Sequence, residues 1–77
     1  MKKPKIGDIV IFHPMPDDTE CRQNYVEIVP AIVVHIWSED TVNLNCIPDC
    51  GTALIPRTSV VFKDNWRGEH YYWTWPE

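Results

Sequence analysis

The stretch AIVVHIWSEDTVNLNCI, residues 31–47, decides the fold. Its first half, residues 31–38, is apolar on both faces of an extended chain, which predicts a central strand that is covered on both sides. Its second half, residues 41–47, alternates apolar with polar side chains, as a strand does when one of its faces is in water. Because Glu39 and Asp40 fit a tight turn between the two halves, the stretch predicts a β-hairpin.

Simple alternation sorts the side chains of this hairpin onto two faces. In the first strand, Ile32, Val34 and Ile36 share one face, and the other face takes Ala31, Val33, His35 and Trp37. We expect His35, which lies among apolar residues, in the core or at an interface. In the second strand, one face takes Val42, Leu44 and Cys46.

Further strands are predicted on both sides of the hairpin. Residues 9–12 follow a Gly-Asp turn and are strand formers, whereas residues 25–29 form a short strand that Pro30 interrupts. Residues 52–62 form another strand, bent or broken at Pro56. No segment has an apolar period of 3.6 residues, so we expect at most one 3₁₀ turn.

The chain ends in an aromatic stretch, HYYWTWP at residues 70–76, which predicts a final strand. One face takes Tyr71, Trp73 and Trp75, and we expect this row to seal the core. Before it, residues 14–24 and 63–69 are polar and are predicted to be loops, the first of them long.

Five short strands in 77 residues predict one domain, residues 1–77, because a chain of this length supports a single core. Closing the sheet into a barrel removes its edges, which suits a chain too short for two sheets. The fold class predicted is therefore all-β: a small five-stranded antiparallel SH3-like barrel with one long early loop.

Charge and hydropathy exclude several classes of protein. The net charge is −4, and the only basic cluster is Lys2, Lys3 and Lys5, so nucleic-acid binding through phosphates is disfavoured. No stretch approaches the roughly 20 apolar residues of a membrane-spanning helix. Residues 1–10 lack the features of a signal peptide, which leads us to expect a cytoplasmic protein with free thiols.

The sequence contains no enzyme signature. Cys46 and Cys50 have the spacing of half a zinc site, but a structural zinc needs four ligands and no second pair exists, so buried and turn cysteines are favoured and no metal is predicted. Cys21 is the best nucleophile because Arg22 follows it, but nothing places a histidine beside it. We therefore expect no catalytic residues and no cofactor.

Three segments together resemble a group of small bacteriophage-encoded proteins: GDIV at residues 7–10, AIVVHI at residues 31–36 and WTWPE at residues 73–77. That group has a GDIV-type first strand, an AIV core strand and a Trp-His-Trp-Pro-Glu ending. Here Thr74 takes the place of the histidine, so any chemistry of that histidine is missing. The resemblance implies a phage origin and an SH3-like fold.

The chain has more large aromatic side chains than one small barrel needs, and a surplus at the surface would mark a binding site. The candidates for ligand or partner binding are two tryptophans, a tyrosine and two arginines: Trp37, Trp66, Tyr72, Arg57 and Arg67. The opposing interpretation is that every aromatic ring packs inside with its polar tip at the surface.

Two functions remain open, and both are non-catalytic. The first is a phage protein that sequesters a nucleotide-derived immune signal of the host, with aromatic rings stacking on bases and arginines holding phosphates. The alternative is a protein-interaction module that binds a host or virion protein through an aromatic groove. Assembly into a homo-oligomer is compatible with both.

Overall fold

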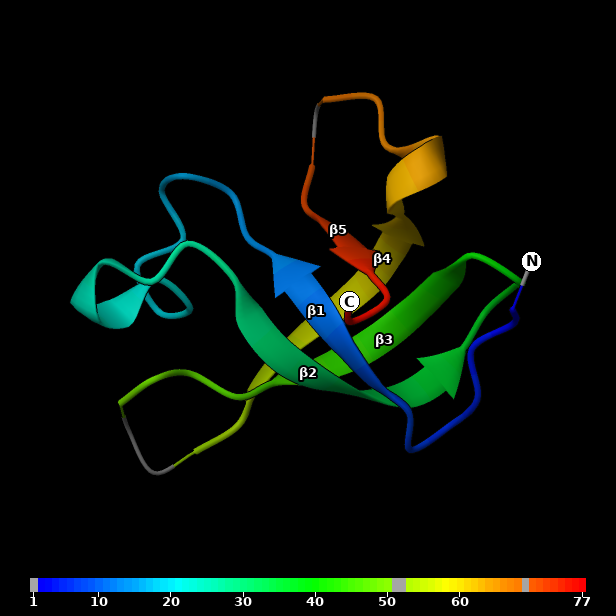
Figure 1. Cartoon of the computed structure of the whole chain (residues 1–77), viewed down its shortest axis with the longest axis horizontal. Helices are drawn as coiled ribbons and strands as arrows, with labels where there is room; N and C mark the ends of the chain where they lie inside the picture. The colour runs from blue at the N-terminus through cyan, green and yellow to red at the C-terminus, as the bar shows by residue number, and fades with distance from the viewer. Residues whose placement is uncertain (1, 51–52, 69) are drawn as a thin grey trace.

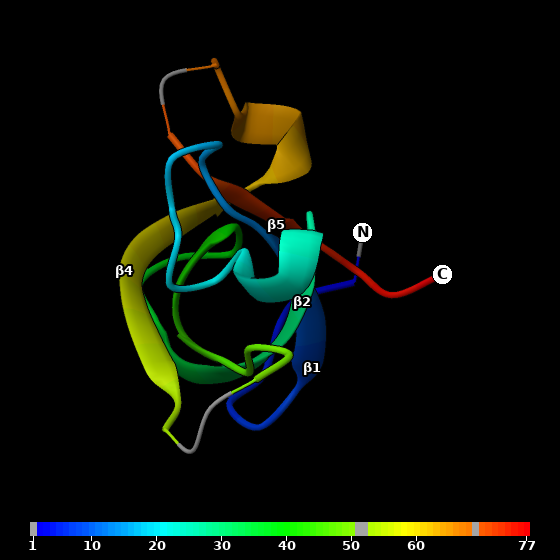
Figure 2. The same ribbon diagram turned by 90° about the vertical axis from the view of Figure 1, so that its left-hand side faces the viewer.

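Five strands of the chain close into a barrel in the computed structural model, which describes residues 2–50, 53–68 and 70–77 (Figure 1). The strands are β1 (Ile9–His13), β2 (Val29–Ile36), β3 (Thr41–Cys46), β4 (Ile55–Phe62) and β5 (Tyr72–Thr74). Two 3₁₀ turns, η1 (Gln23–Tyr25) and η2 (Lys63–Asn65), precede β2 and follow β4, where at most one was expected. The predicted all-β, five-stranded barrel is confirmed, and Figure 2 shows the strands curving around a common interior.

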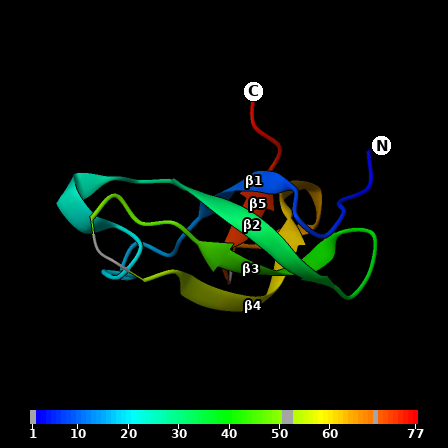
Figure 3. The same cartoon turned by 90° about the horizontal axis from the view of Figure 1, so that it is seen from below.

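Neighbouring strands follow the chain order, and β5 returns to β1 to close the barrel. One pairing departs from the expected antiparallel arrangement: β4 and β5 are parallel, through Val61 opposite Tyr72 and Phe62 opposite Trp73. Parallel neighbours need a crossover longer than a hairpin turn, and the connection from β4 to β5, whose described part includes η2, is this crossover. The long loop after β1 and the 3₁₀ turn before β5 are compatible with a small SH3-like barrel. In Figure 3 the segment after β5 leaves the barrel on the side of β1.

The core is apolar, and its largest fully buried side chains are those of Trp73, Phe12 and Leu44. The predicted inner row of the last strand is confirmed, because Trp73 is fully buried while Tyr71 and Trp75 pack against the core. The Trp73 ring lies 4.7 Å from Phe62 and 5.1 Å from Trp75, between ring centroids. Its indole Nε1 donates a hydrogen bond to the Asp40 carbonyl at 3.0 Å, so the polar tip of this buried ring is satisfied.

The expectation that β2 is covered on both faces is wrong, because Ala31 and Val33 are buried whereas Val34 is 41% exposed. The β2–β3 register shifts between Val33 and His35, so Val34 is an extra residue that reverses the alternation beyond it. As a result His35 is exposed instead of lying in the core, and Trp37 is 61% exposed. By contrast, the inner row of β3 is fully buried, as expected: Val42, Leu44 and Cys46.

The two prolines do not break their strands. β2 begins at Val29 and runs through Pro30, so the separate strand expected at residues 25–29 is wrong. Pro30 still accepts a hydrogen bond from the Ile47 backbone N–H at 2.9 Å, so its missing N–H costs only one bond at the end of the β2–β3 ladder. β4 likewise runs through Pro56, which pairs with Asn45 of β3 but has no partner in β5, because β4 pairs with β5 only from Val61 onward.

Candidate functional site

Three aromatic side chains stack on the outside of the barrel, and we call them the aromatic row: Trp66, Tyr72 and His13. Tyr72 is on the outer face of β5 because it alternates with the buried Trp73, and it pairs with His13 of β1. The rings of His13 and Tyr72 are stacked, with centroids 4.4 Å apart and planes 12° apart. The crossover before β5 places the ring of Trp66 4.7 Å from Tyr72, with the two ring planes tilted by 43°.

An open groove of about 680 Å³ lies beside this row. Its lining comes from β1, the residue before β2, the end of β4, the turn η2, β5 and the residues after β5: Ile11, His13, Ile28, Phe62, Lys63, Asp64, Tyr72, Thr74, Trp75, Pro76 and Glu77. Its floor is ordered by a hydrogen bond of 2.9 Å between His13 Nε2 and Thr74 Oγ1. The lining thus mixes apolar and aromatic side chains with polar and charged ones, and such a mixture can both bind and orient a ligand.

The charges in the groove do not favour an anion. Lys63 is its one full positive charge among the described lining residues, and the lining also holds two carboxylates, those of Asp64 and Glu77. Burial, followed by the nearby charge of Lys63, lowers the pKa of His13, so the imidazole is neutral at pH 7. No arginine is among the described residues that line the groove.

Trp75 forms one wall of the groove and carries an unusual polar group. Its Nε1 is buried and has no hydrogen-bond acceptor among the described residues. The ammonium group of Lys2 lies 4.4 Å from the centroid of the Trp75 ring, at a distance typical of a cation–π contact. This contact ties the N-terminal segment to the end of the chain.

The groove continues into an uncharged surface, which we call the apolar face. It is formed by outward side chains of β1 and β2 and by the residue before β2: Ile9, Ile11, Ile28, Pro30, Ile32 and Val34. Ile9 is 48%, Ile28 47% and Val34 41% exposed. Ile11 and Ile28 belong to both surfaces, so the groove and the apolar face are contiguous. Asn45 of β3, which pairs with Ile32, begins the polar side beyond it.

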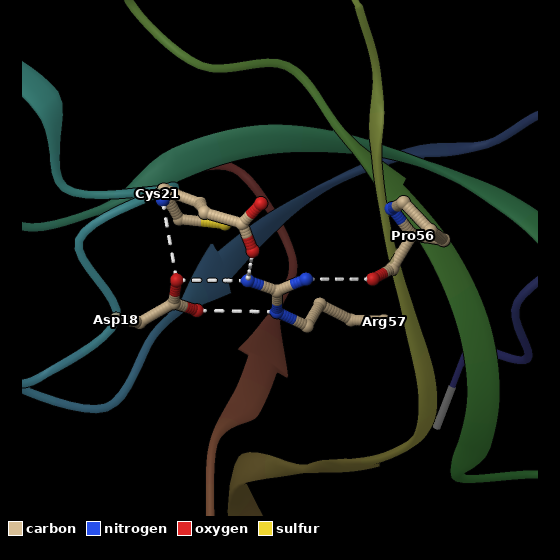
Figure 4. Close-up of polar contacts among 5 residues, drawn as sticks. Asp18, Cys21, Pro56 and Arg57 are labelled. Atoms are coloured by element: carbon tan, nitrogen blue, oxygen red, sulfur yellow. Dashed lines mark hydrogen bonds and ion pairs between the residues drawn. The ribbon is translucent and has the colours of Figure 1, made fainter.

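Arg57 lies away from the groove and braces the long loop (Figure 4). Its Nε and Nη2 donate to the two carboxylate oxygens of Asp18 at 3.1 and 2.8 Å, and Nη2 also donates to Glu20 at 3.1 Å. Nη1 donates to the Pro56 carbonyl at 2.8 Å. The side chains of Arg57 and Asp18 are only 17% and 9% exposed. Carboxylates therefore already engage its guanidinium, and a bound anion would have to displace them.

Burial alone would raise the pKa of Asp18. Hydrogen bonds from Arg57 and from the Cys21 backbone N–H outweigh that effect and hold the pKa below its usual value. The Asp18 carboxylate therefore stays ionised at neutral pH, and the ion pair persists.

Trp37 and Arg67 lie outside the groove lining. The indole Nε1 of Trp37 donates to Asn43 Oδ1 at 2.8 Å, and the ring of His35 meets Trp37 edge-on at 4.4 Å. Trp37 is therefore an exposed ring held in a fixed orientation. Arg67 is exposed and takes part in none of the side-chain hydrogen bonds or ion pairs found within the described residues.

Of the five residues predicted from the sequence, the structure brings together only Trp66 and Tyr72. Sequence reasoning missed His13, Lys63 and Trp75 as groove residues. The position of His13 could have been found, since it alternates with the buried Phe12 and a closed barrel brings the first strand beside the last. The contribution of Lys63 depends on the crossover, which the sequence does not specify.

Other site types have little support in the parts of the chain described. Within residues 2–50, 53–68 and 70–77, no three His, Cys, Asp or Glu side chains gather as ligands of a metal ion would. Cys46 is buried whereas Cys50 is exposed, so the two do not form half of a zinc site. No described helix has the length and hydropathy needed to cross a membrane.

Comparisons with models of protein families, with curated proteins and with solved structures gave no match. The function is therefore argued from the groove, the aromatic row and the apolar face alone.

Proposed function

We propose that this protein is a non-catalytic interaction module that binds an extended segment of another protein in the groove and on the adjoining apolar face. The observation that carries this proposal is the continuity of the two surfaces through Ile11 and Ile28. Exposed apolar side chains that form one patch, with aromatic rings at its margin, are characteristic of protein interfaces. If the resemblance to phage proteins reflects origin, the partner is a host or virion protein.

The groove suits a peptide better than a nucleotide. A base could stack on the exposed ring of Trp66, but its phosphates would meet Asp64 and Glu77 with only Lys63 to offset them. Arg57, the residue that could have held a phosphate, is engaged by Asp18 and Glu20. We therefore favour a partner segment that is mostly apolar and carries a positive charge near the two carboxylates.

A displayed library of random peptides, selected on the purified protein, tests this function. Synthetic versions of the enriched peptides would be titrated by fluorescence anisotropy against the wild type, Tyr72→Ala and, as a matched surface control, Arg67→Ala. We expect Tyr72→Ala to weaken binding about tenfold or more, as loss of an aromatic hot spot does, and Arg67→Ala to leave it unchanged.

A nucleotide panel is the opposing arm of this test. We expect cyclic dinucleotides and ADP-ribose derivatives to leave the melting temperature unchanged at saturating concentration. A clear rise with any of them, together with peptide binding that is indifferent to Tyr72, would overturn the proposal in favour of nucleotide sequestration.

A further inference from the structure

Two thiols from distant parts of the chain lie together inside the barrel. Cys21 belongs to the long loop between β1 and β2, and Cys46 is the last residue of β3. Neither side chain has any solvent exposure, and both belong to the core cluster. Each thiol is among the groups that shift the pKa of the other, as neighbours in space do, and both cysteines are free.

The brace around Arg57 independently holds the backbone of Cys21 near the end of β3. The backbone N–H of Cys21 donates to Asp18 Oδ1 at 3.2 Å, and Asp18 pairs with Arg57 (Figure 4). Arg57 is on β4, two positions after Ile55, which is the register partner of Cys46. The loop is thus held against the end of β3 by groups other than the thiols themselves.

We propose that Cys21 and Cys46 are a redox-modifiable site at which hydrogen peroxide forms a reversible intrachain disulfide, fastening the long loop to β3. In the first step the Cys21 sulfur attacks one peroxide oxygen, the O–O bond breaks, and the products are a sulfenic acid and water. In the second step the Cys46 sulfur attacks the sulfenic sulfur, the S–O bond breaks, and a second water leaves with the remaining thiol proton. Two electrons pass from the sulfur pair to peroxide, and reduction by a dithiol restores both thiols.

Burial makes this reaction slow in the closed protein. Burial, followed by the charge of Asp18, raises the pKa of Cys21 to about 11, and burial also raises the pKa of Cys46. Little thiolate is therefore present at neutral pH, and peroxide reaches the pair only when the loop opens. Asp18→Asn removes a negative charge beside Cys21 and weakens the brace, so this variant should be oxidised faster than the parent.

The disulfide should stabilise the fold, because it would close the chain between Cys21 and Cys46 into a loop in the unfolded state. We expect the melting temperature to rise by about 10 °C or more on oxidation, on the usual scale for a domain of this size. Neither cysteine lines the groove, so the failure of this proposal would leave the proposed function standing, and the reverse also holds.

The test uses the Cys50→Ser variant, since Cys50 is exposed and would compete for peroxide. After treatment with hydrogen peroxide and unfolding, maleimide labelling should find no free thiol in a monomeric chain, and a dithiol should restore both. The matched control, Cys46→Ser with Cys50→Ser, should give no intrachain link and no rise in melting temperature. Two free thiols after prolonged oxidation, links only between chains, or a lower melting temperature after oxidation would overturn the proposal.

Discussion

Two sides of the barrel, the loop side with Asp18 and Arg57 and the groove side with Tyr72 and Trp75, differ in how far their side chains are paired or covered. On the loop side, the nearly buried carboxylate of Asp18 is paired with Arg57 and accepts a backbone N–H as well. On the groove side, Tyr72, Trp75 and the isoleucines of β1 are left partly open, and the Trp75 N–H has no acceptor within the part of the chain described. A cluster whose polar groups are hydrogen-bonded contributes to stability, whereas an exposed apolar surface is available to a partner.

This contrast corrects a simple expectation about arginines and aromatic rings. An arginine in a small acidic protein is not a ligand-binding residue merely because it is present, since an ordered loop can engage it completely. The aromatic surplus does reach the surface, although it is divided between the aromatic row and the separate ring of Trp37.

The largest effect should come from Trp73→Ala, which breaks both regions at once. Strand β5 carries Trp73 inward and Tyr72 outward, so loss of the inner ring undoes the barrel that supports both sides. Truncation of a fully buried tryptophan costs about 3–5 kcal/mol, a large part of the stability of a small domain. Urea unfolding monitored by circular dichroism would measure this loss of unfolding free energy. Trp66→Ala, which removes an exposed ring, is the control, and we expect it to cost about 1 kcal/mol. Equal losses for the two variants would contradict the assignment of the core.

A smaller effect is expected from Asp18→Asn, which breaks the loop side alone. Removing one partner of a largely buried ion pair leaves Arg57 with a reduced set of acceptors, and we expect a loss of about 2 kcal/mol. The neighbouring Asp17→Asn is the matched control, because Asp17 is exposed, and its effect should stay within about 0.5 kcal/mol. Peptide binding in the groove should survive Asp18→Asn. If binding were lost while the protein stayed folded, the two sides would not be independent.

The smallest effects, those of pH, should separate the two sides. The folded pKa of Asp18 is below its unfolded value of about 4, so its contribution to stability is complete above that pH and is lost as pH falls through the folded pKa. The folded pKa of His13 is also lowered, from 6.5, so stability falls as the pH drops below about 6.5 toward the folded pKa.

Unfolding free energies measured from pH 8 to pH 3 would show these two windows. We expect His13→Asn to flatten the curve near pH 6, on the groove side, and Asp18→Asn to flatten it below pH 4, on the loop side. A curve near pH 6 that His13→Asn leaves unchanged would show that His13 is equally protonated in the folded and unfolded states.

Much of the barrel could be predicted because the decisive patterns are local. The alternation in β3 and the inner row around Trp73 follow from side chains that point to opposite faces of an extended chain. The exposure of His35 could not be predicted, because a single extra residue at Val34 reverses the face and leaves no mark in the composition.

The candidate site was less predictable for a related reason. The groove depends on which strands become neighbours and on the connection from β4 to β5, neither of which alternation specifies. The brace between Arg57 and Asp18 joins residues on different elements, so nothing in the local sequence around either residue indicates it.

The antiparallel pairing of β1 with β5 has a mechanical consequence. The pairs run from Ile11 opposite Thr74 to His13 opposite Tyr72, so the chain enters β1 and leaves β5 at the same end of this pairing. A force applied to the two ends of the chain would load these pairs one after another, as in opening a zipper, rather than all together in shear. The barrel should therefore open at low force between β1 and β5, and β5 with its buried Trp73 would be the first strand to separate.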